Sequence, residues 1–215
     1  MLSRLLILEG SWGEKPNDYI SDSLSTTRVY SALEALLWIH GTPIRIIQRP
    51  LLNGRFISDL HQFTSLRSNK TGINIVVLTA HGKKRSKQKL HSRRKTHKRT
   101  LRAIDGTLNL SAKIQKLSQK LSRTILIIDS CQVGADLGSL LQASGALGII
   151  GFAADVDWID SSTFVLAILL KFHEEGVFTS TKSRALTAAR RVMSQMESGA
   201  FSSLWEELEA EYLFR

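Results

Sequence analysis

The feature that most constrains this chain is the alternation of short apolar runs with segments of helical periodicity. The runs of strand length are 4–8, 43–48, 73–79, 124–128 and 146–152. The runs at 73–79 (INIVVLT) and 124–128 (TILII) are β-branched and uninterrupted, which is typical of strands buried on both faces. Alternating strands and helices predict a parallel sheet covered on both sides. We therefore expect an α/β fold, a three-layer α/β/α sandwich with a mainly parallel central sheet.

Helical periodicity fills most of the sequence between these runs. Apolar residues recur at helical spacing over 24–40, 56–66, 111–121, 136–144, 160–175, 183–198 and 202–214. Asp160 is the expected N-cap of the long apolar helix, which Gly176 would end. We expect residues 1–215 to form one domain, with C-terminal helices over 181–215.

The positive charge of the chain comes from one segment. The formal net charge is +10, yet residues 83–102 contain 11 Lys and Arg and no Asp or Glu, and the rest of the chain has a net charge of −1. A nucleic-acid-binding fold more often carries a basic face built from several elements. An isolated basic run is more typical of a solvated loop. We predict a basic inserted loop at 83–102, and docking to nucleic acid or to an acidic partner remains the alternative.

Cys131 is the only cysteine, which excludes an internal disulfide and cysteine-based zinc sites. A single thiol fits a reducing compartment. The apolar run at 5–8 is too short for the core of a signal peptide, and no later run reaches membrane-spanning length. We expect a cytoplasmic protein that has no membrane partner and holds no metal.

Two chemically useful residues follow the two most strongly predicted strands. His81 and Gly82 come shortly after the run at 73–79, and Cys131 comes shortly after the run at 124–128. Parallel sheets place their sites beyond the carboxyl ends of the strands. Neighbouring strands would therefore bring His81 and Cys131 together.

This pair is suited to covalent catalysis. A free thiol has a pKa of about 8.5 and is mostly protonated at neutral pH. An imidazole can take the thiol proton and later protonate the leaving amine. The main-chain N–H groups of Gly82 and Cys131 are the expected oxyanion hole. The alternative is that Cys131 is a small buried apolar residue and that His81 stands at the strand end incidentally.

These segments resemble the caspase-like (clan CD) peptidases, which include caspases, metacaspases, separases, legumains and the bacterial CHAT proteases. The histidine stands about 50 residues before the cysteine, as in caspases. The stretch D-S-C-x-x-G at 129–134 is closest to the metacaspase pattern D-S-C-H-S-G, and residues 145–164 are similar to the segment after the cysteine in small CHAT-like proteins. Gln132 and Val133 stand where metacaspases have His and Ser. The resemblance implies a peptidase without a cofactor, with calcium as the alternative.

The resemblance also implies a substrate preference. Asp129 would help line the pocket for the residue before the cut and favour Arg or Lys there. A partly buried carboxylate is indeed best satisfied by a cation. Glu9 would add negative charge to the rim, and Asp157 and Trp158 would form a pocket wall. The alternatives are that Asp129 caps the following helix or binds its loop, and that Trp158 is a core residue.

The main functional hypothesis is a cysteine endopeptidase that cleaves after Arg or Lys. By resemblance it would be a regulated effector, in bacterial antiviral defence or cell death, activated by a partner protein or a signal ligand. A basic loop beside His81 would then be a site of autoprocessing or regulation. The C-terminal helix would serve as a homodimer or partner surface, or pack onto its own core.

Two other classes compete with a peptidase. One is a catalytically silent caspase-like scaffold that binds a partner or, through residues 83–102, a nucleic acid. The other is a flavodoxin-like nucleotide binder, but residues 10–15 (GSWGEK) match neither a dinucleotide-binding nor a Walker fingerprint.

Overall fold

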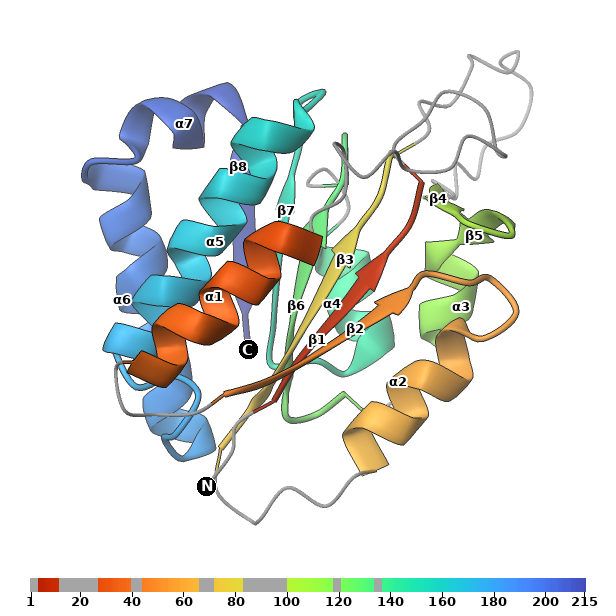
Figure 1. Cartoon of the computed structure of the whole chain (residues 1–215), viewed down its shortest axis with the longest axis horizontal. Coiled ribbons are helices and arrows are strands. Elements are labelled where there is room, and N and C mark those ends of the chain that lie inside the picture. Colours follow the sequence, from red (N-terminus) through yellow and green to blue (C-terminus); the bar gives the residue numbers. More distant parts are fainter. Residues whose placement is uncertain are drawn as a thin grey trace.

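A computed structural model of the chain describes residues 4–11, 27–39, 44–65, 72–82, 100–117, 121–133 and 137–215. Its centre is a sheet of six strands (Figure 1). In spatial order these are β2 (Arg45–Pro50), β1 (Arg4–Glu9), β3 (Asn74–Thr79), β6 (Thr124–Asp129), β7 (Gly148–Phe152) and β8 (Ala210–Phe214). The first five are parallel, and β8 is antiparallel to β7. A separate antiparallel hairpin consists of β4 (Thr100–Ala103) and β5 (Gly106–Asn109).

Helices cover both faces of this sheet (Figure 1). One layer contains α1 (Thr27–Ile39), α5 (Trp158–Glu174), α6 (Lys182–Ser198) and α7 (Ser202–Glu207). The other contains α2 (Phe56–Ser65), α3 (Leu110–Gln115) and α4 (Leu137–Ser144). The predicted three-layer α/β/α sandwich with a mainly parallel sheet is therefore confirmed.

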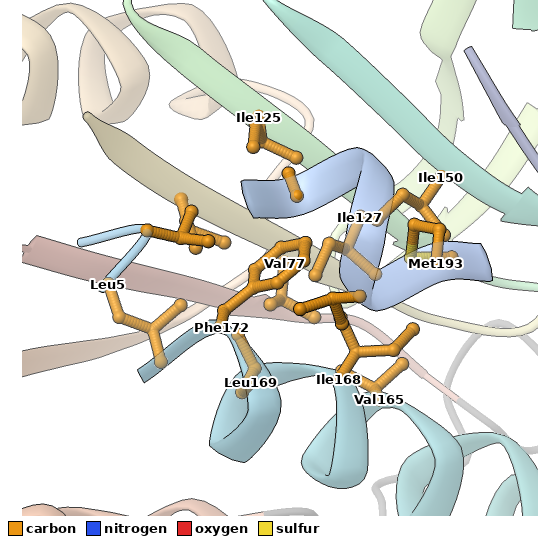
Figure 2. Packing of buried hydrophobic residues seen from close by; sticks show 14 of the residues in the cluster. Leu5, Val77, Ile125, Ile127, Ile150, Val165, Ile168, Leu169, Phe172 and Met193 are labelled. Atoms are coloured by element: carbon orange, nitrogen blue, oxygen red, sulfur yellow. The ribbon is translucent and has the colours of Figure 1, made fainter. Parts of the chain in front are cut away.

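Two apolar cores separate the sheet from its helices. Alternate residues of one strand enter different cores, so that Ile127 packs toward α5 and Ile128 toward the α2–α4 layer. Figure 2 shows the first core, where Phe172 and Ile168 of α5 and Met193 of α6 lie over the strands. Complete burial of such a side chain contributes about 1.5–3 kcal/mol, which explains why uninterrupted apolar runs become the central strands.

The strands end together at one edge. Glu9 is the register partner of Thr79, and Thr79 is the register partner of Asp129. The first five strands follow the doubly wound order, in which β2 is added on one side of β1 and the later strands are added on the other side, beginning with β3. Ligand sites in such sheets lie beyond the carboxyl ends, near this change of side. The edge after β1, β3 and β6 is therefore where function is expected.

The prediction of a helix over 202–214 is wrong. Helix α7 ends at Glu207, Glu209 adopts a left-handed φ of 45°, and the chain continues as β8 along β7. The spacing of Leu204, Leu208 and Tyr212 fits a helix, but Tyr212 and Phe214 also share one face of a strand. Pairing satisfies the main-chain groups along one edge of β7, which a helix at this position would leave unpaired.

Smaller differences concern element ends. The N-cap of α5 is Asp157, whose carboxylate accepts from the Ile159 N–H, and Asp160 lies in the first turn. The predicted loop at 83–102 ends in β4, which includes residues 100–102, and residues 83–99 lie outside the described residues. Among the helices described, none has the length and apolar character needed to cross a membrane.

Candidate active site

His81 and Cys131 follow neighbouring parallel strands. Thr79 and Asp129 are register partners at the last positions of β3 and β6, and each candidate residue stands two positions further along. The Ala80 N–H donates to the Asp129 carbonyl at 3.1 Å, so the two chains remain adjacent just beyond the strands. The expected juxtaposition is therefore present in the main chain.

The main chain of Gly82 lies directly against Cys131. A Cβ added to Gly82 would stand 2.5 Å from the Cys131 carbonyl oxygen and 2.7 Å from the Ser130 hydroxyl oxygen. No side chain fits there, which explains why a glycine follows the histidine. The role of the Gly82 and Cys131 N–H groups as an oxyanion hole remains a prediction.

The main chain of His81 is held from two sides. Its N–H donates to the Ser11 carbonyl at 3.0 Å, and its carbonyl accepts from the Arg102 N–H at 3.0 Å. The Ser11 N–H in turn donates to the Arg102 carbonyl at 2.9 Å. Gly82 and Leu101 form an antiparallel bridge beside these bonds. The segment after β1 and strand β4 therefore fix the position of His81, although they are distant in sequence.

The thiol of Cys131 contacts the loop between β7 and α5. The Val156 N–H donates to the sulfur at 3.4 Å, and the sulfur lies 3.7 Å from the Val156 carbonyl oxygen. Burial raises the pKa of the Cys131 thiol, as does the negative charge of Asp155, while the N–H groups of Val156, Gly82 and Cys131 lower it. The net direction is upward, so this arrangement favours a protonated, resting thiol.

Asp129 belongs to a polar row at the end of the sheet. Glu9, Thr79 and Asp129 are register partners on β1, β3 and β6, so their side chains share the face covered by α1 and α5. Asp129 is completely buried, and its Oδ2 accepts from the Thr79 hydroxyl at 2.9 Å. Glu9 and Asp129, the two carboxylates predicted to bind a basic residue, thus lie on the same face of the sheet, with Thr79 between them.

Burial raises the pKa of Asp129 to about 6, and the charge of Glu9 contributes in the same direction. The hydroxyls of Ser161 and Thr79 lower it by a smaller amount. Among the described residues, Asp129 Oδ1 has no hydrogen bond of standard geometry, although Ser161 lies near enough to act on the pKa. A buried carboxylate with a spare acceptor is a good partner for a cation.

Tyr30 of α1 lies close to this row and was not predicted as a site residue. Its hydroxyl is buried without a hydrogen-bond partner among the described residues. Burial raises the pKa of Tyr30, and the charges of Asp129 and Glu9 raise it further. The polar row thus extends from the sheet to the helix above it.

Asp157 and Trp158 stand at the start of α5. Asp157 is exposed and caps the helix, and Trp158 is half-buried. The first turn of α5 reaches Asp129 through Ser161. That both residues form a pocket wall remains a prediction. The contact observed for Asp157 is its hydrogen bond as the N-cap of α5.

Besides Tyr30, several other contributors were missed in the sequence. Val156 and Ser11 act through main-chain groups, which leave no signature in the side-chain pattern. Thr79 had a signal, because it continues the alternation of Ile75 and Val77 and precedes His81 by only two positions. Within the part of the chain that the structure describes, no cluster of three His, Cys, Asp or Glu residues is arranged to hold a metal ion.

No protein-family model and no curated protein sequence matches the chain. Among solved structures, it is similar to a protein from Geobacter sulfurreducens, with 12% identity, a TM-score of 0.42 and 88% of each chain covered. It is also similar to gingipain R, described as an Arg-specific cysteine proteinase, with 14% identity and a TM-score of 0.46. That match covers 94% of this chain and 44% of gingipain R. Likenesses this distant do not indicate an activity.

Proposed function

We propose that the chain is a caspase-like (clan CD) cysteine endopeptidase in which Cys131 is the nucleophile and His81 is the general base and acid. The observation that carries this proposal is the placement of both residues two positions beyond register partners on adjacent parallel strands. The close approach of Gly82 to Cys131 supports it, because it places main-chain N–H groups beside the sulfur. The site, rather than the distant likeness to gingipain R, carries the proposal.

The reaction follows from these roles. The imidazole of His81 takes the thiol proton, and the thiolate attacks the carbonyl carbon of the scissile peptide. The N–H groups of Gly82 and Cys131 stabilise the tetrahedral oxyanion. When the C–N bond breaks, the imidazolium gives its proton to the leaving amine and a thioester remains. Water, deprotonated by His81, then hydrolyses the thioester and restores the thiol.

The substrate preference that we propose is Arg or Lys before the scissile bond. Asp129 and Glu9 would supply two negative charges on one face, next to the strand end that carries the nucleophile. A bound guanidinium or ammonium group would also compensate for the cost of keeping Asp129 ionised when buried. Asp157 and Trp158 would then flank the substrate from α5.

The wider role that we propose is a regulated effector of the metacaspase or CHAT-like type, cytoplasmic and active in bacterial antiviral defence or cell death. A resting thiol with a raised pKa supports a need for activation by a partner protein or a signal. A homodimer is an alternative route to activation. Cleavage within the basic segment at 83–102 would be one form of regulation.

An affinity label tests the catalytic pair directly. A peptidyl chloromethylketone with Arg at its reactive end is expected to alkylate Cys131 in the wild type and to do so far more slowly in His81→Ala. A matched reagent with Asp in place of Arg is the control for specificity. Equal labelling by both reagents would contradict the basic preference, and equal labelling of both proteins would contradict the role of His81.

One observation favours a second function, a catalytically silent scaffold. The thiol is half-buried, its pKa is raised, and both polar groups of Val156 already contact it. Such a thiol reacts slowly. If no Arg-directed label modifies Cys131 under any activating condition, the scaffold is the better account.

A further inference from the structure

Cys131 lies between two segments that hold it differently. β6 stands between β3 and β7, so the segment with His81 follows the strand on one side of Cys131, and the β7–α5 loop, residues 153–157, follows the strand on the other. The peptidase mechanism uses the first side and leaves the second unexplained. On this second side, the Cys131 sulfur contacts both the N–H and the carbonyl oxygen of Val156.

The residue after the nucleophile connects Cys131 to that loop. The Gln132 N–H donates to the Ala154 carbonyl at 3.0 Å, and the Gln132 side-chain Nε2 donates to Asp155 Oδ1 at 2.8 Å. The next residue of the loop is Val156, whose N–H donates to the Cys131 sulfur at 3.4 Å. The bonds of Gln132 therefore connect this loop to the segment that carries the thiol, and the loop is also held by bonds from Ala153 and Ala154 to the segment before β8.

Gln132 has a backbone conformation that needs such support. Its φ of 57° is left-handed, a region that residues with a Cβ seldom adopt. Conformations of this kind persist where the surroundings over-determine them, and they gather at functional sites. One main-chain and one side-chain hydrogen bond to the same loop provide that constraint.

We propose that Gln132 and Asp155 are positioning residues that hold Cys131 against the main chain of Val156 and thereby set the reactivity of its thiol. We call this pair the Gln132–Asp155 clamp. The inference rests on the proposed role of Cys131 as nucleophile. In this role neither residue contacts the scissile bond. Both act on the position and the electrostatic surroundings of the sulfur.

The clamp brings opposing influences to the sulfur. The negative charge of Asp155 raises the pKa of the Cys131 thiol, and the N–H of Val156, which the clamp also positions, lowers it. Other ionisable side chains on the elements around the sulfur include His81 after β3, Asp129 at the end of β6, and Asp157 and Asp160 at the start of α5. Of the four acids, Asp155 is the one whose charge acts on the thiol pKa.

The competing explanation is that the Gln132–Asp155 bond only fastens an exposed loop. In that case its loss changes thermal stability and leaves the chemistry of the sulfur as it was. The two explanations differ in the pH profile of thiol reactivity, which a purely structural bond does not move.

The experiment measures the rate of Cys131 alkylation by iodoacetamide against pH in the full chain, which has no other cysteine. Asp155→Asn keeps an acceptor for Gln132 and removes the charge, so the midpoint of the profile is expected at lower pH than in the wild type. The control is Asp160→Asn, which removes a carboxylate from the first turn of α5. Its profile is expected to match the wild type.

Salt provides the same test without a substitution. Asp155 is exposed, and the screening length falls from about 10 Å at 0.1 M salt to about 3 Å at 1 M. The wild-type profile is expected to move toward that of Asp155→Asn as salt rises, whereas the variant's own profile moves less. A wild-type profile that ignores salt would contradict a role for this charge.

Gln132→Ala separates position from charge, because it breaks the side-chain bond and keeps Asp155. Release of the sulfur from Val156 is expected to raise the plateau rate at high pH, where the thiol is fully ionised. Unchanged midpoints and plateaus in both variants, with only the melting temperature altered, would overturn the proposal.

These readouts need no peptidase activity. A shifted profile in a protein that cleaves no peptide keeps the clamp and rejects the peptidase. Cleavage of peptides by Cys131 together with unchanged profiles keeps the peptidase and rejects the clamp.

Discussion

The middle and the carboxyl ends of β3 and β6 are equally buried but differ in chemistry. In the middle, residues such as Val77 and Ile127 are completely buried among apolar neighbours. Two positions further along the same face, Thr79 and Asp129 are also completely buried. Asp129 Oδ1 nevertheless has no hydrogen bond of standard geometry among the described residues. The middle is arranged for stability, and the ends keep polar groups that stability alone would not retain.

Two buried serines, one after β6 and one in α5, also have hydroxyls of this kind. Ser130 and Ser162 are buried, and their hydroxyls have no hydrogen-bond partner among the described residues. A missing bond of this kind costs about 1–3 kcal/mol for each group. Buried polar atoms of Arg123 and Thr124, at the other end of β6, also have no hydrogen-bond partner among the described residues, so the carboxylate of Asp129 rather than these hydroxyls distinguishes the edge.

The largest expected effect is on catalysis. Cys131→Ala is expected to reduce kcat/KM for an Arg peptide by a factor on the order of 10⁴ or more, because it removes the nucleophile. Thermal unfolding is expected to change little, since Cys131 is only half-buried. Stopped-flow or end-point fluorescence measures the rate. A variant that retains a tenth of the wild-type rate would place the chemistry elsewhere.

Next in size is a change in the middle of the sheet. Ile127→Ala is expected to lower the free energy of unfolding by about 2–5 kcal/mol, because it leaves a cavity between β6 and α5. Urea titration measures this loss. The alkylation rate of Cys131 at low temperature should stay near that of the wild type. If stability is unaffected, the middle of β6 does not have the stabilising role that its burial suggests.

Asp129→Asn is expected to have opposite effects on stability and function. Its raised pKa means that the folded chain binds a proton between pH 4 and about 6 that the unfolded chain releases. Wild-type stability therefore falls as pH rises through this window, and the full cost, about 3 kcal/mol, is present at neutral pH. The amide has no such cost, so the variant should be more stable at pH 7 and equally stable near pH 4.

The same substitution should remove the preference for Arg and Lys. In the wild type, KM for an Arg peptide is expected to rise as pH falls below about 6, because the carboxylate becomes protonated. In Asp129→Asn this pH dependence should be absent. Ser203→Ala, an exposed change on α7, serves as the control. A variant less stable than the wild type at pH 7 would show that Asp129 is structural.

The smallest expected effect separates two roles of Asp157. Asp157→Ala removes the α5 cap and is expected to lower the free energy of unfolding by about 0.5–2 kcal/mol. Asp157→Ser keeps a capping oxygen and should recover most of that loss. If both variants raise KM equally, Asp157 contacts substrate as well as capping the helix.

The sequence predicts the central strands and the site edge well, and for a physical reason. Continuous β-branched runs such as 73–79 are stable only when both of their faces are buried, as in the centre of a parallel sheet. The residues that follow such a run then lie at the edge of the sheet. The end of the chain was mispredicted because Leu204, Leu208 and Tyr212 satisfy a helix, while the free edge of β7 decides for a strand. The local spacing of apolar residues carries no information about tertiary pairing of this kind.

The candidate site divides in the same way. His81, Cys131 and Asp129 can be proposed from the sequence because side-chain type and position both point to them, and their roles stay predictions. The contacts of Val156 and Ser11 cannot be proposed in this way, since any residue supplies a main-chain N–H or carbonyl. Asp155 lies in the loop after β7, at the edge of the sheet where a site is expected. Asp157 lies in the same loop, and only the structure shows that Gln132, in its left-handed conformation, bonds to Asp155.

The most direct test of the account is cleavage of a peptide library that varies only the residue before the scissile bond, with wild type and Cys131→Ala side by side. The account predicts that the wild type cuts after Arg and Lys and that the variant cuts after neither. Cleavage that persists in Cys131→Ala, or wild-type cleavage that does not distinguish basic from acidic residues, would contradict it.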